Sequence, residues 1–276
     1  MDAVGSLIES LESNEAVVVA TVVGPGDLPS DVIGRRLISR ADGSTYGSLG
    51  AASLNDRAVE EARGVDDATP PVVLALWELT PEEGQAMGLA PGSELQVFIE
   101  TISPPQRFVV VGAGHIAQPL AKLGKMLGFH TTVLDDRPEF ANEERFPDAD
   151  QVIVGPYEEE LSRLEMTPNT YVVLVTRGHV QDENALRQVI TGDQAYLGMI
   201  GSKRRVRGVL QRVSETGVPQ DAIDRVYSPI GLDIGAETPE EIAVSIMAEV
   251  TNVRRRGVRH TSSLSNKDTV TPQGSA

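Results

Sequence analysis

The chain has 276 residues and a mass of 29.5 kDa, and its 40 acidic and 24 basic side chains give a formal net charge of −16. This length predicts two domains, and the acidity argues against nucleic acid as a partner, because binding to phosphates needs many lysine and arginine side chains. The absence of cysteine excludes disulfides, thiolate catalysis and cysteine-ligated metal centres.

Membrane insertion and secretion are not indicated. No stretch approaches the roughly 18 uncharged apolar residues of a membrane span, and Met1–Glu15 contains acids but no lysine or arginine, unlike a signal or transit peptide. The four histidines are scattered, so no metal site is predicted. We expect a cytoplasmic protein without a membrane segment.

The charge is unevenly distributed along the chain. Residues 1–103 hold 17 acidic and 5 basic side chains, and residues 104–276 hold 23 and 19. The change falls at Ser103-Pro104-Pro105, which is typical of a short, stiff linker. We expect an N-terminal domain over 1–103, a second domain over 104–257, and a polar, disordered tail over 258–276.

The first segment has the pattern of an α+β domain. A helix is predicted over Ser53–Arg63, and Thr80-Pro81-Glu82-Glu83 has the form of a capped helix start. Strands are predicted over Ala16–Val23, Arg36–Ser39, Pro71–Leu79 and Glu94–Ile102.

The second segment alternates strand and helix. Its predicted strands are short and apolar, as parallel strands covered on both faces are: Phe108–Val111, Thr131–Leu134, Gln151–Val154, Tyr171–Val175 and a possible fifth, Ala195–Ile200. A last helix is predicted from Thr238-Pro239-Glu240-Glu241. The fold class is therefore α/β: a C-terminal Rossmann-like, doubly wound parallel sheet plus a smaller N-terminal α+β domain.

A glycine-rich turn follows the first strand of this second domain. Gly112-x-Gly114-x-x-Ala117 stands between an apolar strand and a helix, the context of the dinucleotide fingerprint. Asp135 lies 18 residues after Ala117, at a strand end, where an acid can contact a ribose hydroxyl. A phosphate-bearing ligand is predicted here, and the alternative is a scaffold that binds nothing. The turn residues assigned to the ligand are Gly112, Gly114, His115 and Ile116.

Two further loops could carry chemistry. Thr176-Arg177-Gly178-His179 follows a predicted strand, so Arg177 and His179 are expected at the same crevice, with Asp182 orienting the histidine. The alternative is a polar helix cap. The third loop, Gly198 to Arg205, has a Gly-Ser turn before three cations; Ser202 and Lys203 form a candidate anion site, or a solvated basic turn.

Together these motifs resemble the XdhC/CoxI family, whose members are accessory factors of xanthine dehydrogenase and related molybdenum hydroxylases. The resemblance rests on Gly112–Ala117, Thr176–His179, Gly198–Arg205 and Pro229–Ala243, which occur in the family's order. It implies a Rossmann domain that binds molybdenum cofactor, as molybdopterin or its dinucleotide, during its sulfuration and its delivery to the apo-hydroxylase. It also implies a homodimer.

The first domain departs from the family pattern. Members usually read Gly-Ser-Ser-Pro-Arg where this chain has Gly26–Ser30, Gly-Gly-Cys where it has Gly50–Ala52, and Cys-Gly-Gly where it has Pro91–Ser93. Both motif cysteines are absent, so steps that depend on thiols are in question. A cysteine desulfurase or a cysteine-bearing paralogue could supply them.

Three functions remain open from the sequence. The first is a non-catalytic accessory protein that holds molybdenum cofactor. The second is an NAD(P)-dependent oxidoreductase in which His115 or His179 donates a proton. The third is a ligand-free regulatory paralogue. In the first, Asp135 contacts a ribose, and Arg177, His179, Ser202 and Lys203 line the wall opposite the glycine turn.

Overall fold

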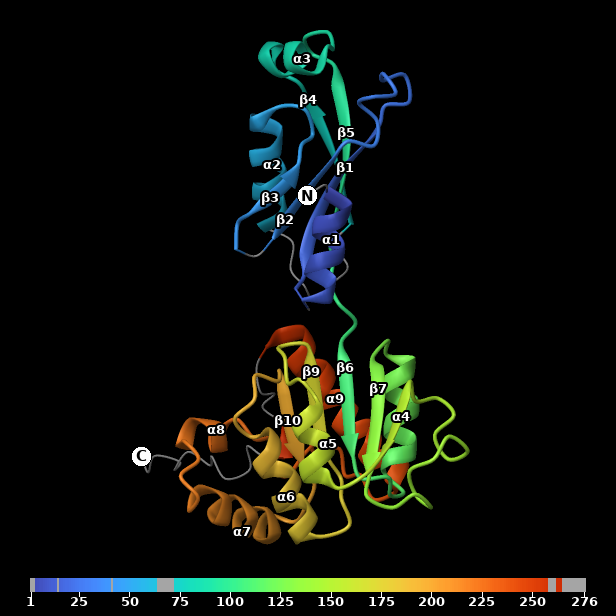
Figure 1. Cartoon of the computed structure of the whole chain (residues 1–276), viewed down its shortest axis with the longest axis vertical. Coiled ribbons are helices and arrows are strands. Elements are labelled where there is room, and N and C mark those ends of the chain that lie inside the picture. The colour runs from blue at the N-terminus through green and yellow to red at the C-terminus, as the bar shows by residue number, and fades with distance from the viewer. Residues whose placement is uncertain (1–2, 14, 41, 64–71, 258–261, 265–276) are drawn as a thin grey trace, which may run out of the picture. The chain divides into compact units, whose positions relative to one another are not determined.

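The computed structural model describes residues 3–13, 15–40, 42–63, 72–257 and 262–264. The chain divides into two compact units, an N-terminal unit over Met1–Pro104 and a C-terminal unit over Pro105–Ala276 (Figure 1).

The N-terminal unit contains one antiparallel sheet of five strands in the order β3-β2-β1-β5-β4. Helix α2 and helix α3 bury one face, where Trp77 packs among apolar strand residues, and α1 packs beside the other face near Val17 and Ile38. The elements in chain order are α1 (Ala3–Glu12), β1 (Val17–Gly24), β2 (Arg36–Arg40), β3 (Thr45–Gly47), α2 (Ala52–Arg63), β4 (Val72–Glu78), α3 (Pro81–Met87) and β5 (Glu94–Ile102).

The C-terminal unit contains a sheet of five parallel strands in the order β10-β9-β6-β7-β8. Its elements in chain order are β6 (Arg107–Val111), α4 (Ala117–Met126), β7 (His130–Asp135), β8 (Gln151–Val154), α5 (Tyr157–Arg163), β9 (Thr170–Leu174), α6 (His179–Val189), β10 (Tyr196–Met199), α7 (Lys203–Ser214), α8 (Gln220–Asp224) and α9 (Pro239–Arg256).

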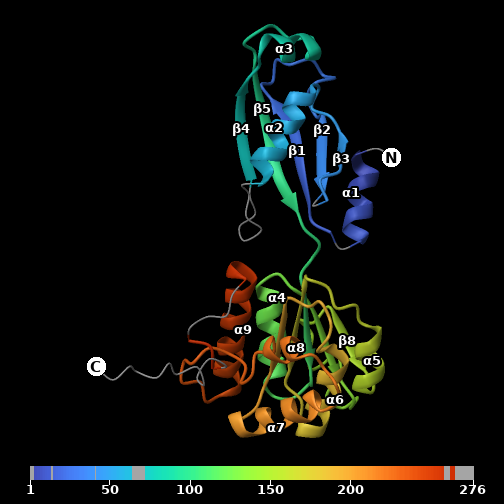
Figure 2. The ribbon, with the colours of Figure 1, turned by 90° about the vertical axis from the view of Figure 1, so that its left-hand side faces the viewer.

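Helices cover both faces of this parallel sheet. Figure 2 shows α4 and α9 on one face and α5 and α6 on the other. The strands alternate between the two cores: Val110 and Val173 face α4 and α9, whereas Val109 and Val172 face the opposite helices. Burial on both faces explains why the strands are continuously apolar. The expected α/β class, with a Rossmann-like sheet and a smaller N-terminal unit, is confirmed.

The strand order reverses beside β6. After β6 the chain first extends the sheet through β7 and β8, then returns to place β9 and β10 on the other side. The connections that follow β6 and β9 therefore lead to helices on opposite faces of the sheet, α4 and α6. This is a switch point, which is where open α/β sheets bind ligands.

Part of the expected tail is ordered. The backbone of Ser263 forms an antiparallel bridge with Leu232, and the N–H of Leu264 donates to the carbonyl of Gly231 at 2.8 Å. Ser263 is buried, and its hydroxyl donates to Glu249. The expectation of disorder is thus wrong for residues 262–264, because a buried acceptor holds them; residues 258–261 and 265–276 lie outside the described ranges.

Candidate functional site

The turn between β6 and α4 depends on a glycine. Gly112 has a φ of +106°, a backbone conformation that L-amino acids rarely adopt. A β-carbon built on it would lie 2.7 Å from the carbonyl oxygen of Val175, in the loop after β9. The two loops are therefore in main-chain contact, and Gly112 serves this contact rather than lining a cavity.

Hydrogen bonding within the protein uses some N–H groups of this turn and leaves others without a partner among the described residues. The N–H of Gly112 donates to Leu134, and that of Ala113 donates to the Asp135 carboxylate, both at 2.7 Å. Within the described residues, the N–H groups of Gly114, His115 and Ile116 have no hydrogen-bond partner. Unpaired N–H groups at a helix start attract anions, and the helix dipole adds to the attraction.

The three residues that carry these N–H groups line a cleft of about 430 Å³ at the switch point. Three loops and the start of α9 form the cleft. Five of the predicted residues line it: Gly114, His115, Ile116, Asp135 and Arg177. A smaller cavity of about 250 Å³ shares His115 and Pro239 with this cleft and continues along α4.

The Asp135 carboxylate is occupied by hydrogen bonds from within the protein. Its side chain is fully buried, and besides the N–H of Ala113 it accepts hydrogen bonds from the Arg137 backbone at 3.1 Å and the Arg137 guanidinium at 2.8 and 3.0 Å. Burial raises the pKa of Asp135, but these bonds and the guanidinium charge outweigh burial, so the net pKa lies below its ordinary value. The carboxylate holds the turn and offers no vacant oxygen to a ribose.

We expect Asp135→Asn to lower the free energy of unfolding at pH 7 by about 2 kcal/mol, because charged hydrogen bonds are lost. A carboxylate with a depressed folded-state pKa contributes stability above its unfolded pKa of about 3.9, and this stability is lost as the pH falls through the folded-state pKa. Urea unfolding at a series of pH values from 7 to 2 should therefore show the difference from wild type shrinking in acid. A difference independent of pH would contradict this role.

The wall opposite the turn comes from the loop after β9. Arg177 lines the cleft and forms a two-pronged ion pair with Asp136, which follows β7. Thr176 is buried in the same loop, and its hydroxyl donates to Asp182 at 2.5 Å. Asp182 is fully buried and also accepts from Arg205, so it ties the second predicted loop to the third.

The other predicted residues either do not line the cleft or have side chains outside the described part of the chain. His179 begins α6, and its side chain lies outside the described part of the chain. Ser202 caps α7, with its hydroxyl accepting from the N–H of Arg205 at 3.4 Å. Lys203 lines a different cavity of about 360 Å³, along α7 and α8. Neither Ser202 nor Lys203 lines the cleft, because the two residues form the start of helix α7.

Five lining residues were missed from the sequence. Arg137 and Phe140 follow β7, Val175 and Thr176 follow β9, and Pro239 begins α9. The guanidinium of Arg137 is stacked 3.7 Å from the Phe140 ring centre. Arg137 stands two residues after the acid that was singled out, so its position after a strand could have indicated it. Pro239 is more than 100 residues away in sequence from the turn, and only the packing of α9 against α4 brings it there.

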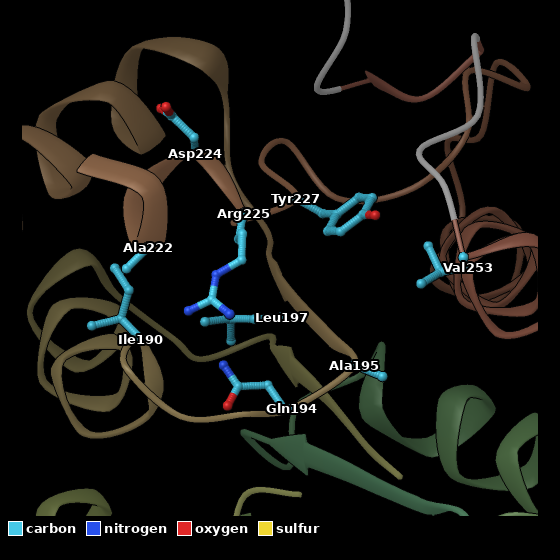
Figure 3. A pocket seen from close by; sticks show the side chains of 10 residues that line it. Ile190, Gln194, Ala195, Leu197, Ala222, Asp224, Arg225, Tyr227 and Val253 are labelled. Atoms are coloured by element: carbon cyan, nitrogen blue, oxygen red, sulfur yellow. The ribbon is translucent and has the colours of Figure 1, made fainter. Parts of the chain in front are cut away.

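A cavity of about 390 Å³ lies elsewhere in the C-terminal unit. Gln194 and Ala195, which precede β10, form part of its wall, so it opens at the amino end of that strand. Figure 3 shows the Arg225 guanidinium pointing toward Leu197 and Gln194. No predicted site residue lines it, and the switch-point cleft remains the better candidate because it alone combines the glycine turn with unpaired N–H groups among the described residues.

Neither a membrane span nor a metal centre is found in residues that the structure describes. No helix there is both long and apolar enough to cross a membrane. No group of three or more histidine, aspartate or glutamate side chains there could hold a metal ion.

The fold and the cleft define a two-unit protein with an antiparallel N-terminal unit and a Rossmann-type unit whose switch-point cleft suits an anionic ligand. Residues 108–250 match the model of the XdhC Rossmann domain, and residues 10–75 match that of the XdhC and CoxI family. The chain belongs to the XdhC and CoxI family.

Curated relatives from two bacteria agree with this assignment. The chain is 32% identical over 221 residues to uncharacterized protein YqeB of Escherichia coli, covering 79% of this chain and 40% of YqeB. It is 36% identical over 160 residues to a protein of Bacillus subtilis named as a probable xanthine dehydrogenase subunit, covering 58% and 46%. It is 23% identical over 163 residues to the molybdenum cofactor insertion chaperone PaoD of E. coli, covering 59% and 45%. The matches span less than half the length of each relative.

A solved structure shares the fold over nearly the whole chain. It is a protein named as a xanthine dehydrogenase from Bacillus halodurans, with a TM-score of 0.52 and 23% identity, covering 96% of this chain and 99% of that one.

Proposed function

We propose that this protein is a cytoplasmic accessory factor of molybdenum hydroxylases of the xanthine dehydrogenase type. It holds molybdenum cofactor, as molybdopterin or its dinucleotide, in the switch-point cleft during maturation and insertion. One observation carries the proposal: Gly114, His115 and Ile116, whose N–H groups have no partner among the described residues, line a cleft of about 430 Å³. Family membership and the names of PaoD and of the Bacillus subtilis relative support it.

The cleft fits the phosphate of such a ligand. Backbone N–H groups bind phosphate without a net charge on the protein, and the start of α4 adds its dipole. Gly114 leaves room for close approach, since a β-carbon built on it would have no heavy atom within 4 Å. The adjoining cavity along α4 provides space for the rest of an extended molecule. His115, which borders both cavities, is assigned to the phosphate or its ester.

The N-terminal unit is assigned to partner docking. The segments in which the family carries cysteine flank α3: the Met87 side chain packs against Gly50, and Pro91–Ser93 follow the helix. No thiol is present in the chain, so sulfur must come from a cysteine desulfurase or a cysteine-bearing paralogue. The acidic N-terminal unit binds that partner or the apo-hydroxylase. The protein acts as a homodimer.

The geometry disfavours the oxidoreductase alternative. Dinucleotide-dependent dehydrogenases use the acid after the second strand to contact ribose, and here Arg137 and the N–H of Ala113 occupy both oxygens of Asp135. Titration with NAD(H) and NADP(H) tests this directly. If protein that holds no pterin binds either nucleotide saturably, the oxidoreductase function would be supported in place of the accessory role.

We expect Gly114→Asp to weaken retention of purified molybdenum cofactor at least about tenfold, because the new carboxylate stands beside the ligand's phosphate. Folding is spared, since the added side chain enters open space. Gly26→Asp is the matched control: it adds the same charge at a glycine that also has no heavy atom within 4 Å, in the other unit. Retention is measured by pterin fluorescence after gel filtration.

Equal retention by wild type and Gly114→Asp would remove the assigned site. Mass spectrometry of the small molecule that co-purifies then identifies the ligand independently of any variant. A pterin mass supports the carrier role, whereas co-purification with a hydroxylase or paralogue in the absence of any pterin supports a ligand-free regulatory role.

A further inference from the structure

An ion pair joins two of the loops that form the cleft. Asp136 follows β7 and Arg177 lies in the loop after β9, and β6 is the strand between them. The guanidinium of Arg177 donates to both carboxylate oxygens of Asp136, at 3.1 and 2.8 Å. The pair therefore crosses the carboxyl end of β6, the same end from which the glycine turn departs.

The two arginines of the cleft are held very differently. Arg137 is bound to Asp135, which is fully buried and also fixed by the N–H of Ala113, so this pair belongs to the framework of the turn. The side chains of Arg177 and Asp136 are 39% and 28% exposed. An ion pair that is open to water contributes only about 0–1 kcal/mol, so an arriving anion can exchange with Asp136.

Among the described residues, Arg177 is the cleft's cation best placed to serve an anion bound at the turn. It lines the same cavity as Gly114 and His115, and guanidinium groups bind phosphate with the two-pronged geometry that they use for carboxylates. An anion at the turn must therefore take Arg177 from Asp136, and it also meets the negative charge of that carboxylate.

We propose that Asp136 competes with bound anions for Arg177 and thereby sets the affinity that an anion needs in order to occupy this cleft. The inference rests on the proposed function. Every anion that uses Arg177 meets the same opposition, so small anions that bind weakly leave the cleft largely free. A ligand that fills the cleft as well gains enough from its other contacts to overcome the opposition. Asp136 thus lowers the occupancy of the cleft by simple phosphates.

The test is isothermal titration calorimetry of the full-length protein with inorganic pyrophosphate. Asp136→Asn keeps the size of the side chain but removes its charge, and we expect it to bind pyrophosphate about fivefold more tightly than wild type, equivalent to ~1 kcal/mol. Asp148→Asn is the matched control, since it removes one exposed acid from the same unit away from the cleft, and it should leave the dissociation constant unchanged.

A second background separates competition from a general effect of charge. In Arg177→Ala, pyrophosphate binding should weaken. Adding Asp136→Asn should then change it less than twofold, because Arg177 is gone and Arg137, whose Nε lies 3.7 Å from the Asp136 carboxylate, stays bound to Asp135. A full fivefold gain in that background would overturn the proposal, as would equal binding by wild type and Asp136→Asn. In either case the cofactor-carrier function stands. If no variant binds pyrophosphate and no pterin co-purifies, the carrier function and the competitor role both fail.

Discussion

Replacing Gly112 by alanine is expected to lower the free energy of unfolding of the C-terminal unit by about 3 kcal/mol. Part of this loss is backbone strain, about 1–3 kcal/mol for a residue forced to a sparsely populated φ, here +106°. The rest is overpacking, because the new methyl group would lie 2.7 Å from the Val175 carbonyl oxygen, and main-chain atoms there cannot rotate away.

Urea unfolding followed by far-UV circular dichroism measures this loss. Trp77, the single tryptophan, lies in the N-terminal unit, so its fluorescence transition should stay in place. Gly114→Ala is the matched control two residues along the same turn: its methyl group enters open space, and a change below about 1 kcal/mol is expected. Equal losses at the two positions would contradict the contact between the loops.

Replacing Glu249 by leucine should also destabilise the C-terminal unit by about 3 kcal/mol. The Glu249 carboxyl group is fully buried and accepts from the Tyr196 hydroxyl at 2.6 Å, the N–H of Gly231 at 2.9 Å and the Ser263 hydroxyl. Leucine leaves these buried donors without their acceptor, and each unsatisfied buried group costs about 1–3 kcal/mol. The apolar contacts of leucine offset part of that cost.

The same unfolding experiment compares Glu249→Leu with Glu240→Leu. Glu240 is exposed in the first turn of the same helix, where losing its interaction with the helix dipole is worth less than about 1 kcal/mol. Hydrogen exchange supplies a second readout, because the amides of Asp233 and Leu264 bond across the ordered segment 262–264 and should lose protection in Glu249→Leu alone. Unchanged protection would mean that Glu249 does not hold that segment.

Local pattern was enough to predict most of the strands. Gln151–Val154 and Glu94–Ile102 are strands with the expected bounds, and the remaining predicted strands differ by one or two residues. Helix α1 and strand β3 were not anticipated: β3 has only three residues, and α1 covers only part of one sheet face. The order of residues 262–264 could not be read from composition, because it depends on Glu249 of the distant α9.

The candidate site was predictable where it depends on strand ends and not where it depends on side-chain partners. The turn at Gly114 and the loop at Arg177 meet because both leave parallel strands at the same edge of the sheet. The sequence could not show that Asp135 would bond Arg137, nor that Asp182 would bond Thr176 and Arg205. The sequence therefore predicted that Asp135 contacts a ribose, although hydrogen-bond donors of the protein itself occupy the Asp135 carboxylate.

The contact between the two loops depends on residue identity at Gly112 and only on main-chain atoms at Val175 and Thr176. The atoms nearest to a β-carbon on Gly112 are the carbonyl carbon and oxygen of Val175 and the α-carbon of Thr176, all of which every amino acid possesses. Over generations, substitutions at position 175 can accumulate without disturbing this junction, while position 112 admits none that adds a side chain. In descendants of this gene, the glycine should persist even where the opposing residue drifts, so the two positions would show no covariation although they touch.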